Sequence, residues 1–348
     1  MVRLFLLLCL AVNTWLVPAA PAGAGGFPAI LADKPPRLLS QYGFFAGPGI
    51  EHPAEGVVGY DLATPLFSDN AVKVRHVVLP EGAAARYDGE EVLDFPAGTA
   101  LIKTFAYPAD FRKPDEDIRL VETRLLLRQK SGWLALAYVW NEDQGDAELK
   151  VAGKRLTVDF IDKAGEPVSF EYAVPNRNQC KGCHSINGEI SPIGPKARNL
   201  NHMQADGSNQ IAAWIEGGML QGAPDVKAIP AAANWRDESR TIEARARAWL
   251  DVNCAHCHRR EGAASNSGLF LTHGEKDMTA LGIYKRPVAA GRGAGDNEFD
   301  IVPGQPDSSI LLSRVSSIEP GVMMPELGRN LADPEAVELL RAWILSLR

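Results

Sequence analysis

Two pentapeptides of the sequence carry cysteine and histidine at a spacing that suits one particular chemistry. They are 180–184 and 254–258, and each has the pattern Cys-x-x-Cys-His. Two cysteines three positions apart lie on the same side of a helical turn, so both thiols can form thioethers to one haem. The histidine after them then presents its imidazole to the iron as the proximal ligand. The pattern predicts two covalently bound haem c groups, attached to Cys180, Cys183, Cys254 and Cys257, with His184 and His258 as iron ligands.

The same cysteines allow two other interpretations. Two Cys-x-x-Cys pairs could bind one tetrahedral zinc, and each pair could form a disulfide. The histidine directly after the second cysteine of both pairs favours haem over either alternative. His256, inside the second motif, is interpreted as a spacer residue with an exposed ring.

The sixth ligand of each iron has to come from outside the motifs. For the second haem we choose Met324, which precedes a proline on a loop before the last predicted helix, with Met323 as the second choice. A methionine thioether in this position raises the reduction potential. For the first haem Met219 is the first choice. Met203, His202, a residue of the β domain or no residue at all are the alternatives that remain open.

Composition and charge describe a soluble globular protein. The chain has 348 residues, of which 46% are hydrophobic and 23% charged, enough for two or three domains. The formal net charge of −7 argues against a nucleic-acid partner. We therefore expect redox partner proteins and no nucleic acid.

The N-terminus has the pattern of a secretory signal peptide over residues 1–24. Arg3 supplies the positive charge, residues 4–16 form a short apolar stretch that includes Cys9, and Ala22-Gly23-Ala24 is a cleavage site. No later stretch is apolar enough to span a membrane. The sequence thus predicts a periplasmic protein with no transmembrane segment in the mature chain, and export agrees with haem attachment outside the bacterial cytoplasm.

Residues 25–175 are expected to form a β-rich domain. Short runs of β-forming residues alternate with turn signals such as Asp88-Gly89 and Ser131-Gly132. This pattern favours an antiparallel sandwich or barrel. The runs cover 72–79, 101–107, 119–127, 133–140, 147–151, 156–161 and 168–172. Lys103, Glu122 and Arg124 fall within these runs and are expected to face solvent or to be paired.

Two haem units are expected after this domain, one over 176–230 and one over 231–348. The loop at 192–201 resembles the Gly-Pro loop of cytochromes c, in which a backbone carbonyl accepts the second imidazole N–H of the proximal histidine. In the second unit an apolar helical stripe leads into Cys254, and Asp333-Pro334-Glu335 opens a final helix. The predicted fold class is therefore α+β multidomain, with a β domain followed by two mainly α-helical cytochrome c-type haem units.

The chain also resembles a family of exported dihaem c-type cytochromes of uncharacterised role, in which a β domain precedes two Cys-x-x-Cys-His units. The resemblance implies haem and this architecture, and it implies no particular reaction. The tail from 303 to 344 is similar to bacterial cytochrome c domains in general. The stretches that carry the family resemblance are 65–69, 103–105, 138–142, 194–201 and 253–258.

The function expected from these features is the transfer of single electrons between redox partners outside the cytoplasm. One alternative is a dihaem enzyme, peroxidase-like or an oxidase, with an open distal site on the first haem. A second alternative is a haem-based redox or gas sensor. An electron-transfer protein is preferred to a catalyst, because no catalytic motif accompanies the two haem motifs.

Overall fold

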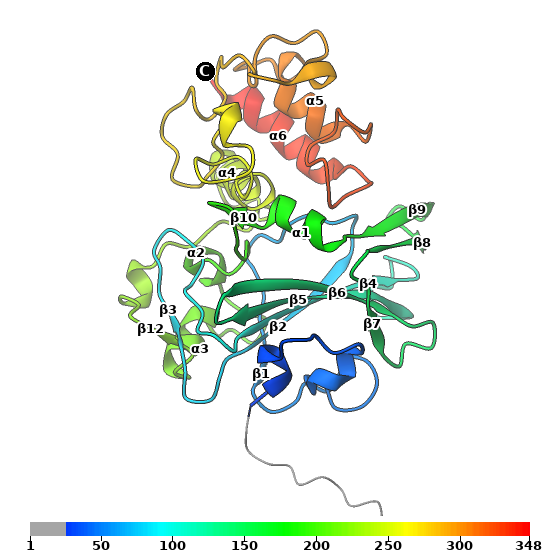
Figure 1. Cartoon of the computed structure of the whole chain (residues 1–348). Coiled ribbons are helices and arrows are strands. Elements are labelled where there is room, and N and C mark those ends of the chain that lie inside the picture. The colour runs from blue at the N-terminus through cyan, green and yellow to red at the C-terminus, as the bar shows by residue number, and fades with distance from the viewer. Residues whose placement is uncertain (1–25) are drawn as a thin grey trace, which may run out of the picture.

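A six-stranded antiparallel sheet forms the centre of the molecule (Figure 1). The computed structural model describes residues 26–348, so the predicted signal peptide lies outside the described residues. The strand order, β1-β2-β4-β5-β6-β7, follows the chain and does not return on itself. The strands are β1 (Val57–Gly59), β2 (Val72–Val78), β4 (Ala100–Pro108), β5 (Ile118–Gln129), β6 (Gly132–Trp140) and β7 (Ala147–Leu149).

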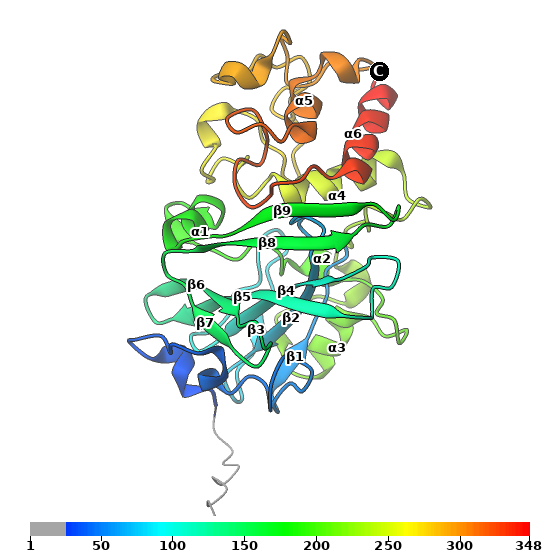
Figure 2. The ribbon, with the colours of Figure 1, turned by 90° about the vertical axis from the view of Figure 1, so that its right-hand side faces the viewer.

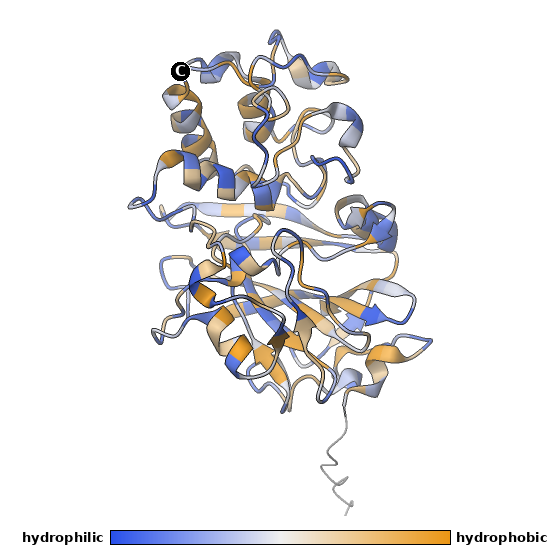
Figure 3. Ribbon diagram, turned by 90° about the vertical axis from the view of Figure 1, so that its left-hand side faces the viewer, coloured by the Kyte–Doolittle hydropathy of each residue, from blue (hydrophilic) through white to orange (hydrophobic). Residues whose placement is uncertain are grey.

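One face of this sheet forms an apolar core. Ile102 of β4 pairs with Leu125 of β5, which pairs with Leu136 of β6, and all three side chains belong to this core. Two short 3₁₀ helices, η1 (Pro28–Leu31) and η2 (Leu39–Tyr42), cover it. Figure 3 shows hydrophobic residues concentrated on the strands of the sheet. The alternation seen in the sequence is therefore confirmed as the alternation of a core face with a second face.

The second face of the sheet meets a hairpin of two further strands. These are β8 (Lys154–Ile161) and β9 (Pro167–Val174), which pair with each other and with no other strand of the described chain. Tyr107 of β4 stacks on Phe160 of the hairpin with ring centroids 5.6 Å apart. Figure 2 shows the hairpin as a layer between the sheet and the C-terminal helices. All seven strands predicted from the sequence are confirmed, and each begins and ends within two residues of its predicted bounds.

The segment between the two motifs packs on the second face as well. Helices α2 (Ala197–Leu200) and α3 (Gln210–Glu216) bury Leu200 and Trp214 in one cluster with Val77 and Leu101 of the sheet. Two short strand pairs involve this segment. β10 (Ser185–Ile186) pairs with β11 (Glu189–Ile190) within it, and β12 (Leu220–Gln221) pairs with β3 (Ala85–Arg86), which comes from the connection between β2 and β4.

The C-terminal part has a core of its own. Helices α4 (Ile242–Asn253), α5 (Ile310–Ser316) and α6 (Pro334–Ser346) share one apolar cluster, in which Trp249 and Trp343 are both buried. The predicted start of the last helix is confirmed, because Asp333 accepts a hydrogen bond from Ala336 N at 3.1 Å and Pro334 follows it. Within residues 26–348 no helix combines the length and the apolar character needed to cross a bilayer.

The predicted fold class is wrong in its haem units. The α-helices of the first unit are only α1 (Arg177–Cys183), α2 and α3, of 7, 4 and 7 residues, followed by the 3₁₀ helix η3 (Val226–Ala228). In the second, residues 254–309 contain no α-helix and only the short η4 (Ser265–Ser267), η5 (Gly291–Ala294) and η6 (Pro306–Ser308).

The physical reason lies in the residues around the motifs. Glycine, proline, asparagine and aspartate recur between 259 and 309 and break helices. The apolar residues of the first region are buried against the sheet rather than against one another. The described chain is therefore a mostly β body. Its sheet is open, because β1 and β7 at its two edges do not pair with each other, so the barrel expected as one alternative is not formed. The two Cys-x-x-Cys-His motifs are followed largely by loops. The domain boundaries at 175 and 230 stay predictions.

Candidate functional site

The first motif forms a short helix, α1, that starts with a reciprocal cap. Asn176 Oδ1 accepts hydrogen bonds from Asn178 N at 3.0 Å and Gln179 N at 2.9 Å, and Gln179 Oε1 accepts from Asn176 N at 2.9 Å. This capping box satisfies three backbone donors that would otherwise lack partners. At the other end His184 N donates to Cys180 O at 3.0 Å, so Cys180 and Cys183 lie on one helical turn. Both thiols can therefore reach one flat group.

The His184 ring has one nitrogen engaged and one available. Nδ1 lies 2.9 Å from Ser191 O, and a carbonyl can only accept, so Nδ1 carries the proton. Burial lowers the pKa of His184 to about 4, which keeps the imidazole neutral. The lone pair on Nε2 is then available to a metal. The expected backbone acceptor is thus Ser191, one residue before the predicted loop.

A cavity of about 210 Å³ lies beside the first motif. Cys180, Cys183 and His184 line it from α1, and the second face of the sheet lines it opposite. The C-terminal part closes it, with Trp249 of α4 and Met324 among the lining residues. Figure 1 shows the same arrangement, with α1 between the sheet and the C-terminal helices.

A row of three basic side chains crosses the sheet and lines this cavity. Arg75 of β2, Lys103 of β4 and Arg124 of β5 are direct cross-strand neighbours. Arg124 pairs with the buried Glu122. Arg75 Nη1 lies 3.7 Å from the exposed carboxylate of Asp61 and donates to Lys73 O at 3.4 Å, whereas Arg75 Nη2 is buried without a hydrogen-bond partner among the described residues. The row thus places uncompensated positive charge against an enclosed space, which is unfavourable unless an anionic group or a lone-pair acceptor lies there.

Lys103 is the least compensated member of the row. Its Nζ makes no hydrogen bond or ion pair within residues 26–348 and lies 4.7 Å from the centroid of the Phe105 ring. Burial, then the charges of Arg75, Lys73 and Arg124, hold its pKa well below the usual value. The side chain is a lining residue of the cavity. The expectation that Lys103, Glu122 and Arg124 face solvent or are paired is therefore wrong for Lys103.

The second motif follows α4 without a break. His258 N donates to Cys254 O at 2.9 Å, which again places the two cysteines on one turn. His258 Nδ1 lies 3.3 Å from Ser267 Oγ, and burial lowers the pKa of His258 to about 4. The ring is neutral, and Nε2 is the nitrogen left for a metal, as in His184.

A second cavity, of about 690 Å³, opens beside this motif. Cys254, Cys257 and His258 line it together with Leu269, Leu311 and Met324. The backbone N–H and C=O of Met324 are both hydrogen-bonded. Met324 N donates to Arg314 O at 2.9 Å, and Met324 O accepts from Arg329 Nη2 at 2.8 Å. The structure therefore brings Met324 to the cavity of His258, as a distal ligand requires.

The two motifs touch each other. Cys257 Sγ lies 3.6 Å from Gly182 O, and Asn187 N donates to Glu261 O at 2.9 Å. A hydrogen bond from Cys257 also lowers the pKa of the Cys183 thiol. The two motifs would consequently hold their groups close to each other.

His256 lies at this contact and corrects the expectation of an exposed spacer. The residue is 8% exposed, and its Nδ1 is buried without a hydrogen-bond partner among the described residues. Its side chain lines both cavities. The contact between the motifs therefore contains a polar ring that neither motif pattern indicates.

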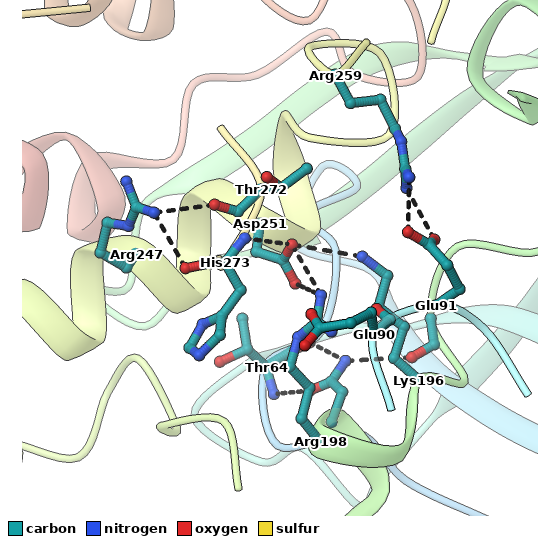
Figure 4. Close-up of polar contacts among 12 residues, drawn as sticks. Thr64, Glu90, Glu91, Lys196, Arg198, Arg247, Asp251, Arg259, Thr272 and His273 are labelled. Carbon is teal, nitrogen blue, oxygen red and sulfur yellow. Dashed lines mark hydrogen bonds and ion pairs between the residues drawn. The ribbon is translucent and has the colours of Figure 1, made fainter. Parts of the chain in front are cut away.

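A buried polar network holds the two motifs in this arrangement (Figure 4). Asp251 of α4 accepts from Arg198 Nη2 at 2.8 Å, lies 3.4 Å from Lys196 Nζ and accepts from His273 N at 3.0 Å. Lys196 and Arg198 belong to the loop and helix after the first motif, whereas α4 leads into the second. A further ion pair joins Arg259, directly after the second motif, to Glu91 at 2.6 Å.

The other predicted ligands lie elsewhere. Met219 packs in the cluster of Trp214 and lines neither cavity. Met203 is 63% exposed, and His202 Nδ1 lies 3.1 Å from Met203 O. None of these three, nor Met323, lines the cavity of His184. The residues that the sequence interpretation missed are the basic row, whose only signal was charge inside predicted strands.

The donor set at both cavities fits a c-type haem. Each cavity offers two thiols, one imidazole Nε2 and apolar walls, and the first adds Arg75, whose Nη2 has no hydrogen-bond partner among the described residues and could donate to a propionate. Residues 26–348 contain no group of three or more His, Cys, Asp or Glu side chains placed to hold a metal ion directly. No family model, curated protein or solved structure matches the chain, which leaves the chemistry of its own residues to indicate the function.

Proposed function

We propose that the protein is an exported dihaem c-type cytochrome that passes single electrons between redox partner proteins outside the cytoplasm. The observation that carries the proposal is the contact between the two Cys-x-x-Cys-His motifs through Cys257 and Gly182. Each motif faces its own cavity, and the cavities share lining residues. Two redox groups held close to each other can exchange an electron directly, which is what a carrier with two centres needs.

The chain's own residues have separable tasks in this proposal. Cys180, Cys183, Cys254 and Cys257 attach the porphyrins, and His184 and His258 bind the irons. When bound, each haem supplies the one-electron exchange between ferric and ferrous iron. Ser191 O and Ser267 Oγ hold the imidazoles in place. Burial keeps both rings neutral, so no proton has to leave them before they bind iron.

Met324 is the proposed sixth ligand of the second haem. Its backbone is held by Arg314 and Arg329, and its side chain lines the cavity of His258. A His/Met pair raises the potential of that iron. The second haem would then be the electron acceptor of the pair.

The test is to express the whole chain together with a haem-attachment apparatus and to stain a denaturing gel for haem. We expect two haems per chain, one lost when Cys180→Ala and Cys183→Ala are combined and the other lost when Cys254→Ala and Cys257→Ala are combined. Cys9→Ala is the matched control and should leave the stain unchanged, because it lies outside both motifs. Absence of covalent haem in the wild type would overturn the proposal.

Function is then tested on the purified holoprotein. Two low-spin haems that are reduced and reoxidised by small redox proteins, and that do not react with peroxide or carbon monoxide, are the expected result. Rapid turnover of peroxide at one haem would instead establish an enzyme. Reversible binding of carbon monoxide without turnover would establish a sensor.

A further inference from the structure

We propose that Lys103 is the sixth ligand of the first haem, with its Nζ bound to the iron on the face opposite His184. The inference depends on the proposed function, because it requires a haem at the first motif. It names a ligand that lies on the β sheet, far in sequence from either motif. It also fills the position for which the motif itself offers no residue.

Lys103 holds the central place within the basic row. From β5 to β2 the order is Arg124, Lys103, Arg75. All three line the cavity that His184 lines from α1. Arg124 is paired with the buried Glu122, and Arg75 donates to Lys73 O at 3.4 Å. Lys103 is therefore the member of the row whose charged group makes no hydrogen bond or ion pair within residues 26–348.

The Lys103 amine has no other partner among the described residues. Its Nζ makes no hydrogen bond or ion pair there, and its neighbours in the row are both cations. An enclosed ammonium in this position is unfavourable. If the ammonium releases its proton to solvent, the neutral amine keeps a lone pair that can be donated to iron. One Fe–N bond then replaces one N–H bond, and no electron is transferred.

The other polar residues of the cavity are less suitable as ligands. Arg75 and Arg124 cannot lose a proton and so cannot bind iron. His256 lies at the contact between the two motifs and lines both cavities, so it does not belong to the first cavity alone. Met324 lines both cavities, but its loop is anchored on the side of the second motif through Arg314. Asn253, Gln179 and Asp333 also line the cavity, but each has an oxygen that accepts a hydrogen bond from a backbone N–H group. The Lys103 amine has no hydrogen-bond partner among the described residues.

The consequence is a direction for electron flow. Because Met324 raises the potential of the second haem and an amine ligand lacks this effect, the first haem is the lower in potential. An electron that enters at the first haem therefore moves to the second across the contact between Gly182 and Cys257.

The test uses Lys103→Ala and Lys103→Met in the holoprotein, with Lys73→Ala as the matched control. Lys73 is a second enclosed lysine on the same face of the sheet, and burial lowers its pKa to about 7, but it does not line the cavity. Electron paramagnetic resonance and near-infrared magnetic circular dichroism of the ferric protein report spin state and ligand type.

We expect the wild type to show one haem with amine ligation. Lys103→Ala should turn that haem high-spin, and added imidazole should return it to low spin. Lys103→Met preserves most of the length of the side chain and should give a His/Met spectrum with a higher potential. Lys73→Ala should change neither haem.

Failure of this inference is distinguishable from failure of the proposed function. If the haem stain shows no covalent haem, the proposed function itself fails. If two haems are attached and both stay low-spin in Lys103→Ala with unchanged spectra, the function stands and Lys103 is not the ligand. Should Lys103→Ala not accumulate, Lys103→Met decides, because an unchanged spectrum there overturns the assignment equally.

Discussion

Replacing Asp251 with alanine is expected to destabilise the protein by about 3–5 kcal/mol, the usual effect of removing one partner from a buried ion pair. The Asp251 residue is 5% exposed, and its carboxylate lies 2.8 Å from Arg198 Nη2 and 3.4 Å from Lys196 Nζ. Both cations are themselves enclosed, with side chains 5% and 10% exposed. The Asp251→Ala variant would leave two buried positive charges without their carboxylate.

Further variants divide the expected loss of unfolding free energy between charge and hydrogen bonding. Asp251→Asn keeps an oxygen that can accept a hydrogen bond from His273 N, so this variant should lose only the stabilisation that depends on the charge of the carboxylate. Adding Arg198→Leu to Asp251→Ala removes one of the uncompensated cations. The double variant should therefore be less destabilised than the sum of the two single variants, by about 1–3 kcal/mol.

The measurement is urea unfolding of the holoprotein, followed by circular dichroism, with Glu298→Ala as the control. Glu298 pairs with Arg286 at 3.4 Å, with side chains 64% and 68% exposed, and such pairs contribute less than about 1 kcal/mol. Asp251→Ala and Glu298→Ala with equal unfolding free energies would refute the role of the buried network. Strict additivity of Asp251→Ala and Arg198→Leu would refute its electrostatic origin.

Other substitutions and a change of pH have equally specific expected outcomes. Burial opposes ionisation of Asp251, but the charges of Lys196 and Arg198 outweigh burial and lower the pKa of Asp251. The contribution of Asp251 to the unfolding free energy is therefore complete above the unfolded-state pKa of about 3.9 and is lost as the pH falls below that value. Unfolding of wild type and Asp251→Ala measured over a range of pH can show this loss. Met324→Ala should turn one ferric haem high-spin in the optical spectrum, whereas Met219→Ala, in the apolar cluster of α3, should turn neither. Trp343→Ala should lower the unfolding free energy by about 3–5 kcal/mol, because the Trp343 side chain is fully buried in the cluster of α4 and α6. Leu345 is 56% exposed, so Leu345→Ala should change the unfolding free energy by less than about 0.5 kcal/mol. Gly262→Ala should reduce haem attachment at the second motif, measured as haem per chain, because the added Cβ would clash with Cys257 O.

Local patterns in the sequence were sufficient for the parts of the fold that depend on local order. The strands of the sheet follow from alternation and turn residues, as in β2 and β4, and the start of α6 follows from Asp333 and Pro334. The same holds for the placement of Cys180 and Cys183 on one helical turn. Each of these features depends on residues only a few positions apart.

The features that the sequence did not predict depend on distant pairs. The basic row exists only because the register places Lys103 between Arg75 and Arg124, and a shift of one residue would turn the shifted side chain away from the cavity. The contact between Cys257 and Gly182 likewise depends on how two separate segments dock. The prediction of helical haem units failed for a related reason, because a Cys-x-x-Cys-His motif specifies one turn of helix and leaves the conformation of the next residues undetermined.

The enclosure of the first cavity also constrains the order of events during biogenesis. Its walls come from segments as far apart in the chain as Tyr60 and Asp333, and the cavity is complete only after the C-terminal part has docked on the sheet. If the proposed haem is attached at this cavity, the porphyrin must be in place before the walls close. Thioether formation at Cys180 and Cys183 would then precede the final collapse of the chain, and the prosthetic group would serve as a template around which the strands and the last helices assemble.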